Sequence, residues 1–307
     1  MTATGGRLAT LLSEGSFVVT GEIVPPKGAG SEVVTQHARE LVGSIDAVNV
    51  TDNPAASAHM SPLAGVRFVA EAGIEPTLQL TCRDRNRLAL TSDLLGGWAL
   101  GARNLLAMGG DPIQIGDHPD GVAVHDLRVH GLVALARRLR EEGNTLAGTA
   151  VEDPPRFLIG VADSPLADRY DPARLQAKLD AGADFVMTQI VYDVERLGAW
   201  ADRERPTGLF DRAKVIVGVS PLRSAKQASF MNEKLPGVSV PTETISSLEA
   251  AGDSAPAVGI DQAVAIVGAI RGIAGIAGVH LMAMGHDDMV RTVVERAGLF
   301  PRPTGGT

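Results

Sequence analysis

Short runs of mostly apolar residues recur along the chain and alternate with longer segments in which apolar residues return at a helical period. The short runs are apolar throughout rather than alternating, which is typical of strands covered on both faces. The pattern predicts eight strands, over Phe17–Val24, Asp46–Asp52, Glu75–Cys82, Asn104–Gly109, Phe157–Ala162, Phe185–Val191, Val215–Val219 and Val279–Met284. It also predicts eight helices, over Val33–Val42, Pro62–Ala72, Ser92–Ala99, Leu127–Glu142, Pro172–Ala181, Val194–Arg203, Ala225–Lys234 and Ile260–Ala274.

Eight strand–helix units in one chain of 307 residues favour a single domain. We therefore expect an α/β fold, a single (β/α)8 TIM barrel that spans residues 7–300. The alternative is a doubly wound sheet, which normally carries a G-x-G-x-x-G motif after its first strand, and this motif does not occur in the sequence. We also expect a frayed N-terminus over residues 1–6, a disordered tail over residues 301–307, and a loop with a short helix within 236–258.

Composition and charge limit which classes of partner and which cellular compartment fit this protein. A formal net charge of -8 argues against a nucleic-acid partner or an anionic membrane surface. No apolar run approaches the roughly 20 residues of a membrane span, and the first residues lack the basic and apolar regions of a signal peptide. Cys82 is the sole cysteine, which rules out an internal disulfide and fits a reducing compartment. We therefore expect a cytoplasmic protein with no nucleic-acid and no membrane partner.

Polar residues and glycines follow the predicted strands where a barrel would place its chemistry. In TIM barrels the functional side chains lie at the C-terminal ends of the strands. Those ends carry Glu22, Thr51-Asp52-Asn53, Thr81-Cys82-Arg83, Gly109-Gly110-Asp111, Ala162-Asp163, Gln189, Ser220-Pro221 and Gly285-His286. We expect them to converge, with Glu22 pointing into the mouth of the barrel rather than into the core.

Each candidate also has a purely structural interpretation. Glu22 is equally well explained as a solvated acid at a strand end, and Asp111 before a proline as the cap of a turn. Gly109-Gly110 forms either a tight turn or a close approach to a ligand. Gln189 lies in an apolar strand, where its amide needs partners, and this favours a ligand contact.

Several families of chemistry find no support in the sequence. It contains no phosphate-binding G-x-x-x-x-G-K-[ST] loop, no H-E-x-x-H and no G-x-S-x-G. The seven histidines are scattered, and one cysteine cannot build a zinc cluster, so no metal site is predicted. The residues alone indicate a barrel enzyme whose acid is Glu22, with an acidic partner at Asp111.

Seven segments together resemble the methylenetetrahydrofolate reductase family. In family order they are TGEIVPPKG (20–28), DAVNVTDNP (46–54), LQLTCRDRNR (78–87), ARNLLAMGGDP (102–112), KLDAGADFVMTQIVYD (178–193), VGVSPLRSAKQ (217–227) and GVHLMAMG (278–285). Each is weak singly, but together they cover nearly the whole chain. The segments TCRDRNR, SDLLGGWALG and GDHP are similar in sequence to the short reductase subunits of acetogenic bacteria.

The resemblance implies a flavin-bearing barrel that reduces 5,10-methylenetetrahydrofolate to 5-methyltetrahydrofolate. It implies that Glu22 and Asp111 are catalytic and that both bind the substrate together with Gln189 and Gln227. The flavin contacts that it implies fall on Thr51, Gln79, Met108, Gly109, Gly110, Asp111, His125, Ala162, Asp171 and Lys178.

Three departures from the family pattern bear on the cofactor. Gln79 stands where many relatives have histidine, and Gly109 where an arginine often precedes Gly-Asp. Asp163-Ser164-Pro165 replaces a frequent Gly-Tyr-Pro that is followed by a histidine. The resemblance implies FAD, the usual cofactor of the family. Because the three losses concern the residues around the outer half of the flavin, FMN is the alternative, and a flavin-free form is to be excluded.

In the implied reaction, protonation of the folate N10 opens its ring to an iminium cation, which accepts a hydride from reduced flavin N5. Glu22 is the expected proton donor, since a carboxyl group in a desolvated mouth holds its proton to higher pH. Asp111 would stabilise the cation, and Gln189 would contact the pterin edge. NAD(P)H or an electron-delivering partner subunit would supply electrons, and a homo-oligomer is compatible with the sequence.

Three other functions remain open at this point. The main alternative is a folate- or pterin-binding subunit of a methyl-transfer or electron-transfer complex, without reductase activity of its own. A methyl-transferring barrel would need a metal-ligand cluster or an activated thiol, and the sequence offers neither. An aldolase-like lyase would need a lysine on a strand, whereas Lys27 follows a strand and Lys178 lies in a predicted helix.

Overall fold

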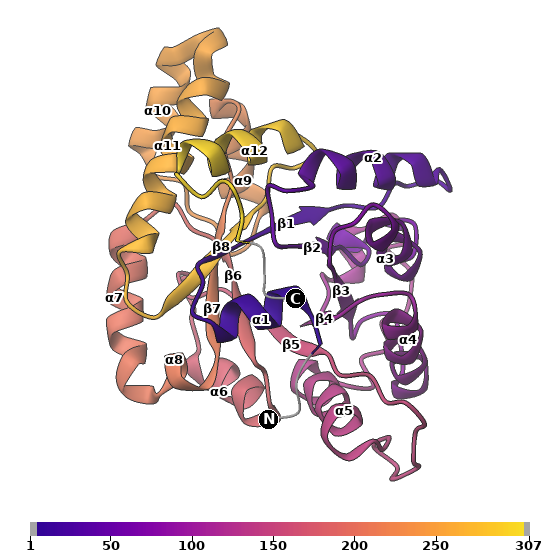
Figure 1. The fold of residues 1–307 in the computed structure, drawn as a ribbon. Helices are drawn as coiled ribbons and strands as arrows, with labels where there is room; N and C mark the ends of the chain where they lie inside the picture. Colours follow the sequence, from indigo (N-terminus) through magenta and orange to yellow (C-terminus); the bar gives the residue numbers. More distant parts are fainter. Residues whose placement is uncertain (1–4, 304–307) are drawn as a thin grey trace.

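The eight strands close into a ring. In the computed structural model, which describes residues 5–303, each strand pairs in parallel with the next one and the last pairs with the first (Figure 1). The strands are β1 Val18–Ile23, β2 Ala47–Val50, β3 Pro76–Thr81, β4 Asn104–Met108, β5 Leu158–Asp163, β6 Phe185–Ile190, β7 Lys214–Val219 and β8 Ile276–Leu281. The expected TIM barrel is confirmed.

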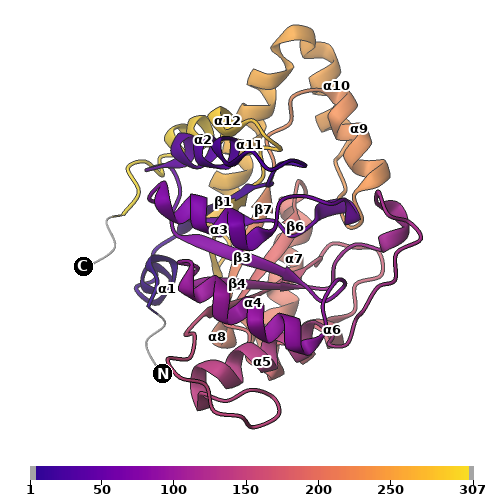
Figure 2. The ribbon, with the colours of Figure 1, turned by 90° about the vertical axis from the view of Figure 1, so that its right-hand side faces the viewer.

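Helices surround the ring and connect its strands (Figures 1 and 2). The α-helices are α1 Arg7–Ser13, α2 Ser31–Leu41, α3 Pro62–Glu71, α4 Arg87–Ala99, α5 Val129–Glu142, α6 Pro172–Ala181, α7 Val194–Glu204, α8 Leu209–Arg212, α9 Ala225–Lys234, α10 Thr242–Ala251, α11 Ala255–Arg271 and α12 Asp287–Arg296. Single 3-10 turns are η1 Pro54–Ala56, η2 Ile113–Ile115, η3 Arg205–Thr207 and η4 Gly252–Ser254. No helix within residues 5–303 has both the length and the apolar content that a membrane span requires.

All eight predicted helices are present, with shifts at their ends. Helix α4 begins at Arg87, well before the predicted Ser92, because the Asn86 side chain accepts a hydrogen bond from the Ala89 N–H at 3.0 Å and caps the helix there. Helix α10 lies inside the segment 236–258, as expected. The sequence pattern missed α1, α8 and α12; the first two have only 7 and 4 residues, too few for a helical period to stand out.

One end of the barrel is filled by side chains. Successive residues of a strand face opposite sides, so every second one points into the ring. Near the N-terminal ends, inward apolar residues such as Val18, Ala47 and Ile216 pack against the apolar face of α1, which lies across this end (Figure 1). Gly160 leaves room for the Phe185 ring, since a Cβ at Gly160 would lie 2.1 Å from that ring. The interior of the ring has space at the opposite end, where the strands finish.

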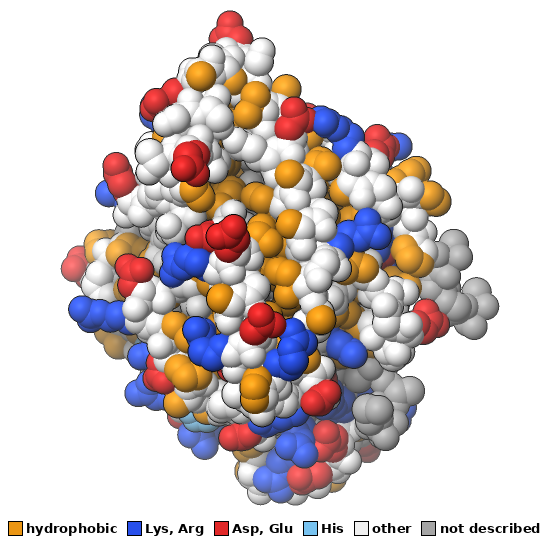
Figure 3. Space-filling view, turned by 90° about the vertical axis from the view of Figure 1, so that its left-hand side faces the viewer, with side chains coloured by type: hydrophobic (Ala, Val, Ile, Leu, Met, Phe, Trp, Pro, Cys, Tyr) orange, Lys and Arg blue, Asp and Glu red, His pale blue; other side chains and the backbone are white. Residues whose placement is uncertain are grey.

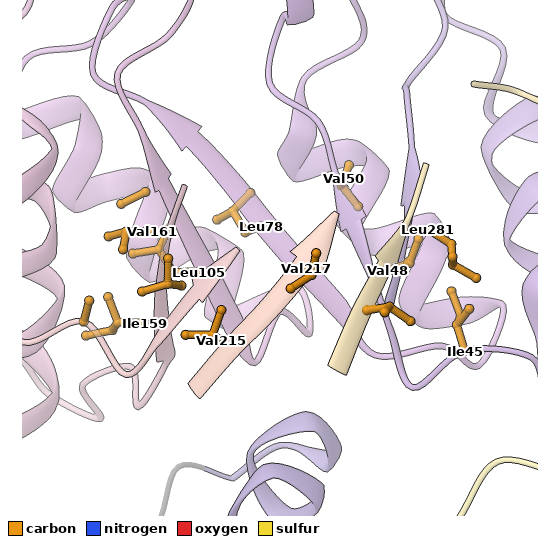
Figure 4. Packing of buried hydrophobic residues seen from close by; sticks show 14 of the residues in the cluster. Ile45, Val48, Val50, Leu78, Leu105, Ile159, Val161, Val215, Val217 and Leu281 are labelled. Atoms are coloured by element: carbon orange, nitrogen blue, oxygen red, sulfur yellow. The ribbon is translucent and has the colours of Figure 1, made fainter. Parts of the chain in front are cut away.

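The outward-facing strand residues form the main core with the surrounding helices. Val48, Leu78, Leu105, Ile159 and Val217 belong to this cluster (Figure 4). On the outer face of the molecule in Figure 3, basic and acidic side chains are interspersed.

Asp46 links both ends of the described chain to the barrel. Its carboxylate is 1% exposed and accepts hydrogen bonds from the Val19 N–H at 2.8 Å and from the guanidinium groups of Arg7 at 2.9 Å and Arg302 at 2.7 Å. Arg302 is itself buried and also donates to the Leu299 carbonyl at 2.9 Å. These contacts hold the C-terminal segment against the start of β1.

The expected frayed segment over 1–6 and disordered tail over 301–307 stay predictions. Within the described residues, a buried ion pair with Asp46 holds Arg302, and Gly6 is buried against the Glu75 carboxylate. Residues 1–4 and 304–307 lie outside the described residues.

Replacing Arg302 by alanine should lower the free energy of unfolding by about 3 kcal/mol, since it removes the main partner of a buried carboxylate. Urea unfolding of the wild type and of Arg302→Ala measures this difference. Arg291→Ala is the control, because Arg291 pairs with Glu295 on an exposed helix face, and its loss should cost less than about 1 kcal/mol. Equal losses in the two variants would contradict the role of Asp46 as an anchor.

Candidate active site

A cavity of about 130 Å³ lies at the C-terminal ends of the strands. Every strand except β7 contributes to it, and its lining is largely polar or sulfur-containing. The lining residues are Glu22, Asn49, Gln79, Leu106, Met108, Ala162, Asp163, Ser164, Met187, Thr188, Gln189, His280 and Met282. Five of the predicted catalytic, substrate-binding and cofactor-binding residues meet here, namely Glu22, Gln79, Met108, Ala162 and Gln189, together with Asp163 from the predicted strand ends.

Glu22 points into this cavity because of the register of β1. Val18, Thr20 and Glu22 are alternate residues of the strand, so they share the inner face, and Val18 belongs to the apolar plug below. The Glu22 side chain is 26% exposed. Its Oε2 lies 3.5 Å from Gln79 Nε2, which donates to it. The carboxyl is thus neither a freely solvated acid nor a member of a structural ion pair with Lys or Arg.

His280 is a second titratable residue of the cavity, and the sequence reasoning gave it no role. It is 2% exposed, and the β1–β8 register pairs it with Thr20. Its Nδ1 lies 2.9 Å from Thr20 Oγ1, and its Nε2 lies 3.9 Å from Glu22 Oε2. A polar, ionisable residue inside the apolar run 276–283 was the signal that could have identified it.

The two glutamines predicted to bind substrate lie in different places. Gln189 reaches the cavity, where its Nε2 donates to the Pro236 carbonyl at 3.2 Å and its Oε1 accepts from the Ile190 N–H at 3.0 Å. Gln227 is not among the lining residues; its Oε1 accepts from the Arg223 N–H at 2.8 Å. A ligand would have to replace the Pro236 bond to use the Gln189 amide.

Asp111 does not meet Glu22 in the cavity. The residue is exposed, and its Oδ2 accepts a hydrogen bond from the Ala55 N–H at 2.8 Å. Ala55 belongs to a turn with positive φ values, which this carboxylate closes. Buried Arg83 donates to the Asp111 carbonyl at 3.1 Å and fixes the same loop from below. The structure therefore places Asp111 at the rim, as the cap of a neighbouring turn.

The neighbouring glycines behave as a tight turn. Gly110 has a φ of 85°, and a Cβ there would lie 2.8 Å from Arg83 Cβ, so internal packing alone accounts for this glycine. Gly109 is exposed, and the nearest atom to a Cβ there would be 3.9 Å away. Neither glycine lines the cavity.

The remaining residues of the predicted cofactor set are spread around the mouth. Thr51 is buried, and its Oγ1 has no hydrogen-bond partner among the described residues. His125 is exposed, with a φ of 43°. Exposed Asp171 caps α6 by accepting from the Ala173 N–H at 3.1 Å. Neither His125 nor Asp171 lines the cavity.

Lys178 is held by a carboxylate that the sequence reasoning left without a role. Its Nζ donates to the Ala162 carbonyl at 2.6 Å and to Asp163 Oδ1 at 3.1 Å. The Asp163 side chain is 8% exposed, and its Oδ2 has no partner among the described residues. Burial raises the pKa of Asp163, while the Lys178 ammonium opposes that rise.

Within residues 5–303, one group of metal-type side chains has its ligand atoms within 4.8 Å of one another: His37, Glu40 and Asp287. The His37 and Asp287 side chains contact each other directly. None of the three lines the cavity.

Comparison with known proteins gives the family. Residues 7–298 match the family model described as methylenetetrahydrofolate reductase. The chain belongs to the methylenetetrahydrofolate reductase family. It is 28% identical to "Methylenetetrahydrofolate reductase 1" of Schizosaccharomyces pombe over 237 residues, which are 74% of this chain and 36% of that protein. It is 26% identical to "5,10-methylenetetrahydrofolate reductase" of Pectobacterium carotovorum over 230 residues, 73% of this chain and 72% of that one.

The chain thus spans about a third of the length of the fission yeast relative. Among solved structures, an "Uncharacterized protein from Clostridium thermocellum" that "binds two copies of 5-methyl-5,6,7,8-tetrahydrofolic acid" has a TM-score of 0.62 at 16% identity. The superposition covers 95% of this chain and 99% of that chain, and it shows that the fold is shared.

A pH-dependent stability should follow from the buried carboxyl of Asp163. Its pKa is raised above the ordinary 3.8, so its stabilising contribution is complete below that pH and is lost as the pH rises through the raised value. Relative to Asp163→Asn, the wild type should therefore lose unfolding free energy as the pH rises above the ordinary carboxyl value of 3.8. Urea unfolding at a series of pH values measures the difference.

Asp168→Asn, on the exposed loop after β5, is the matched control and should run parallel to the wild type. A wild type that gains stability over Asp163→Asn as the pH rises would show that Lys178, rather than burial, dominates at Asp163.

Proposed function

We propose that this chain reduces 5,10-methylenetetrahydrofolate to 5-methyltetrahydrofolate, with Glu22 as the proton donor. The proposal is supported chiefly by the Glu22 carboxyl of β1, which lies in a polar cavity at the C-terminal end of the barrel. Residues 7–298 of this barrel match the reductase family. The Clostridium thermocellum neighbour, described as binding 5-methyltetrahydrofolate, supports a folate ligand for this architecture.

The proton transfer requires an acid close to the folate N10. The methylene carbon bridges two nitrogens and accepts a hydride poorly while the five-membered ring is closed. Protonating N10 breaks the bond between N10 and the methylene carbon and leaves an iminium cation. Glu22 sits at the strand end with its carboxyl toward the cavity, and the backbone leaves β1 through Pro25, so the position of the acid is fixed by the fold.

The lining amides suit the pterin ring, which carries both donors and acceptors at its edge. Gln189 offers both kinds of group from β6, and Asn49 Oδ1 is a buried acceptor without a partner among the described residues. Gln227 would contact the part of the folate outside the cavity. Asp111 would act from the rim by fixing the turn of residues 53–56, since its carboxylate is already engaged by Ala55.

The residues around the mouth fit the ring system of a flavin. Thr51 follows β2 and offers a buried hydroxyl that has no partner among the described residues, and Gln79, Met108 and Ala162 line the cavity. Gly109, Gly110 and Asp111 lie at the rim, and His125, Asp171 and Lys178 would face the outer part of the cofactor. When bound, the flavin would supply the hydride. We propose FAD, with NAD(P)H or a partner subunit as the electron source in a cytoplasmic enzyme.

Glu22→Gln should lower folate turnover by about 100-fold or more, because general acid catalysis contributes factors of roughly 10² to 10⁴. Reduction of bound flavin by NADH under anaerobic conditions should persist. Glu14→Gln, on an exposed carboxylate at the opposite end of the barrel, is the control. Full turnover in Glu22→Gln would refute the assignment, and folate binding without any turnover in the wild type would favour the non-catalytic binding subunit.

The purified protein should be yellow and should release a flavin with the mass of FAD on heat denaturation. The absorption spectrum and mass spectrometry of the released compound measure this. Release of FMN would mean that the protein binds only the inner half of the cofactor, the ring system with its phosphate, and would contradict the choice of FAD. A colourless protein that reduces methylenetetrahydrofolate with NADH would contradict the flavin proposal while leaving the role of Glu22 intact.

A further inference from the structure

Thr20, Glu22 and His280 form a contiguous polar row on the inner face of β1 and β8. The register places His280 directly beside Thr20, and Glu22 follows two residues later on the same face. Thr20 is 0% and His280 is 2% exposed, so water does not compete for their contact. His280 therefore touches Thr20 with one ring nitrogen and faces Glu22 with the other.

The hydrogen-bond pattern assigns the tautomer of His280. A buried hydroxyl group donates its proton to some acceptor. Among the described residues, His280 Nδ1 is the acceptor that Thr20 Oγ1 contacts, at 2.9 Å. Thr20 thus donates and Nδ1 accepts, which leaves the proton of the neutral imidazole on Nε2. That N–H faces Glu22 Oε2 at 3.9 Å.

We propose that His280 is a positioning residue for the acid of the proposed reduction: its Nε2–H hydrogen-bonds the carboxylate that Glu22 becomes when it protonates N10. This inference rests on the proposed function. In the step, the O–H bond of Glu22 breaks and an N–H bond forms at N10, so the negative charge appears on Glu22 while His280 keeps its proton. The 3.9 Å separation suits this role, because catalytic hydrogen bonds are often long without substrate and shorten in the complex.

A donor aimed at the charged form of an acid favours that form and makes the acid stronger. The titratable residues that line the cavity are Glu22, His280 and Asp163, and the last of these is paired with Lys178. Gln79 is the other donor to Glu22, at 3.5 Å. Loss of the His280 N–H should therefore weaken the acid and hold its proton to higher pH, which a merely structural role of His280 does not predict.

Two substitutions of His280 distinguish the contribution of its Nε2 from that of its Nδ1. The amide nitrogen of Gln can take the place of imidazole Nε2, whereas that of Asn lies near Nδ1 and cannot reach Glu22. His280→Asn should lower kcat about tenfold, as expected for a hydrogen bond to a charged group. It should also move the pH at which kcat/KM falls by half upward by about one unit. His280→Gln should restore most of both values, with KM for the folate little changed in either variant.

Nitrogen-15 NMR of the histidine ring in the wild type tests the tautomer without any substitution or turnover. A proton on Nε2 is the expected result, and Thr20→Val should let the two tautomers mix. A proton on Nδ1 would overturn the proposal, as would equal kinetics of His280→Asn and His280→Gln or a downward shift of the pH midpoint. A wild type that does not reduce the folate would overturn the proposed function itself and this role with it, before any variant is made.

Discussion

Closure of eight parallel strands into one ring determines where chemistry can occur in this molecule. Because the ring is closed, inward side chains of every strand share one interior, and α1 fills its lower end with apolar side chains. The cavity lies near the C-terminal ends, where the inner face carries Glu22, Gln79 and Gln189. The position of Glu22 follows from this constraint and from the two-residue repeat of β1.

Two polar atoms at the C-terminal end of β2 are buried without partners among the described residues. Asn49 Oδ1 belongs to a residue of the cavity lining and Thr51 Oγ1 follows the strand, and each costs free energy that a ligand could recover. The two carboxyl groups of the cavity have different partners. Asp163 forms an ion pair with Lys178, whereas the Glu22 carboxyl lies beside the Gln79 amide and the His280 ring. The proton-donor role proposed for Glu22 requires this weaker set of partners, because a fixed cation beside an acid would keep it ionised.

The sequence predicted what depends on local pattern and on strand order. Apolar runs predicted all eight strands, and the rule that barrel chemistry lies at strand ends predicted that Glu22 and Gln189 would lie at the mouth of the barrel. It could not predict contacts between loops that are far apart along the chain. The Asp111 carboxylate accepts a hydrogen bond from the Ala55 N–H, 56 residues away in the sequence, and Arg302 donates to Asp46, 256 residues away. The position of His280 beside Thr20 and Glu22 was not predicted, because it results from the pairing of the first strand with the last.

The proposed reaction requires a folate in this cavity with its N10 against Glu22. A crystal structure of the protein with 5-methyltetrahydrofolate would show where the folate binds. We expect the pterin among the residues that line the cavity, with a Glu22 carboxyl oxygen within hydrogen-bond distance of N10. A folate bound outside the cavity, or a Glu22 side chain turned away from N10, would contradict the proposed reaction.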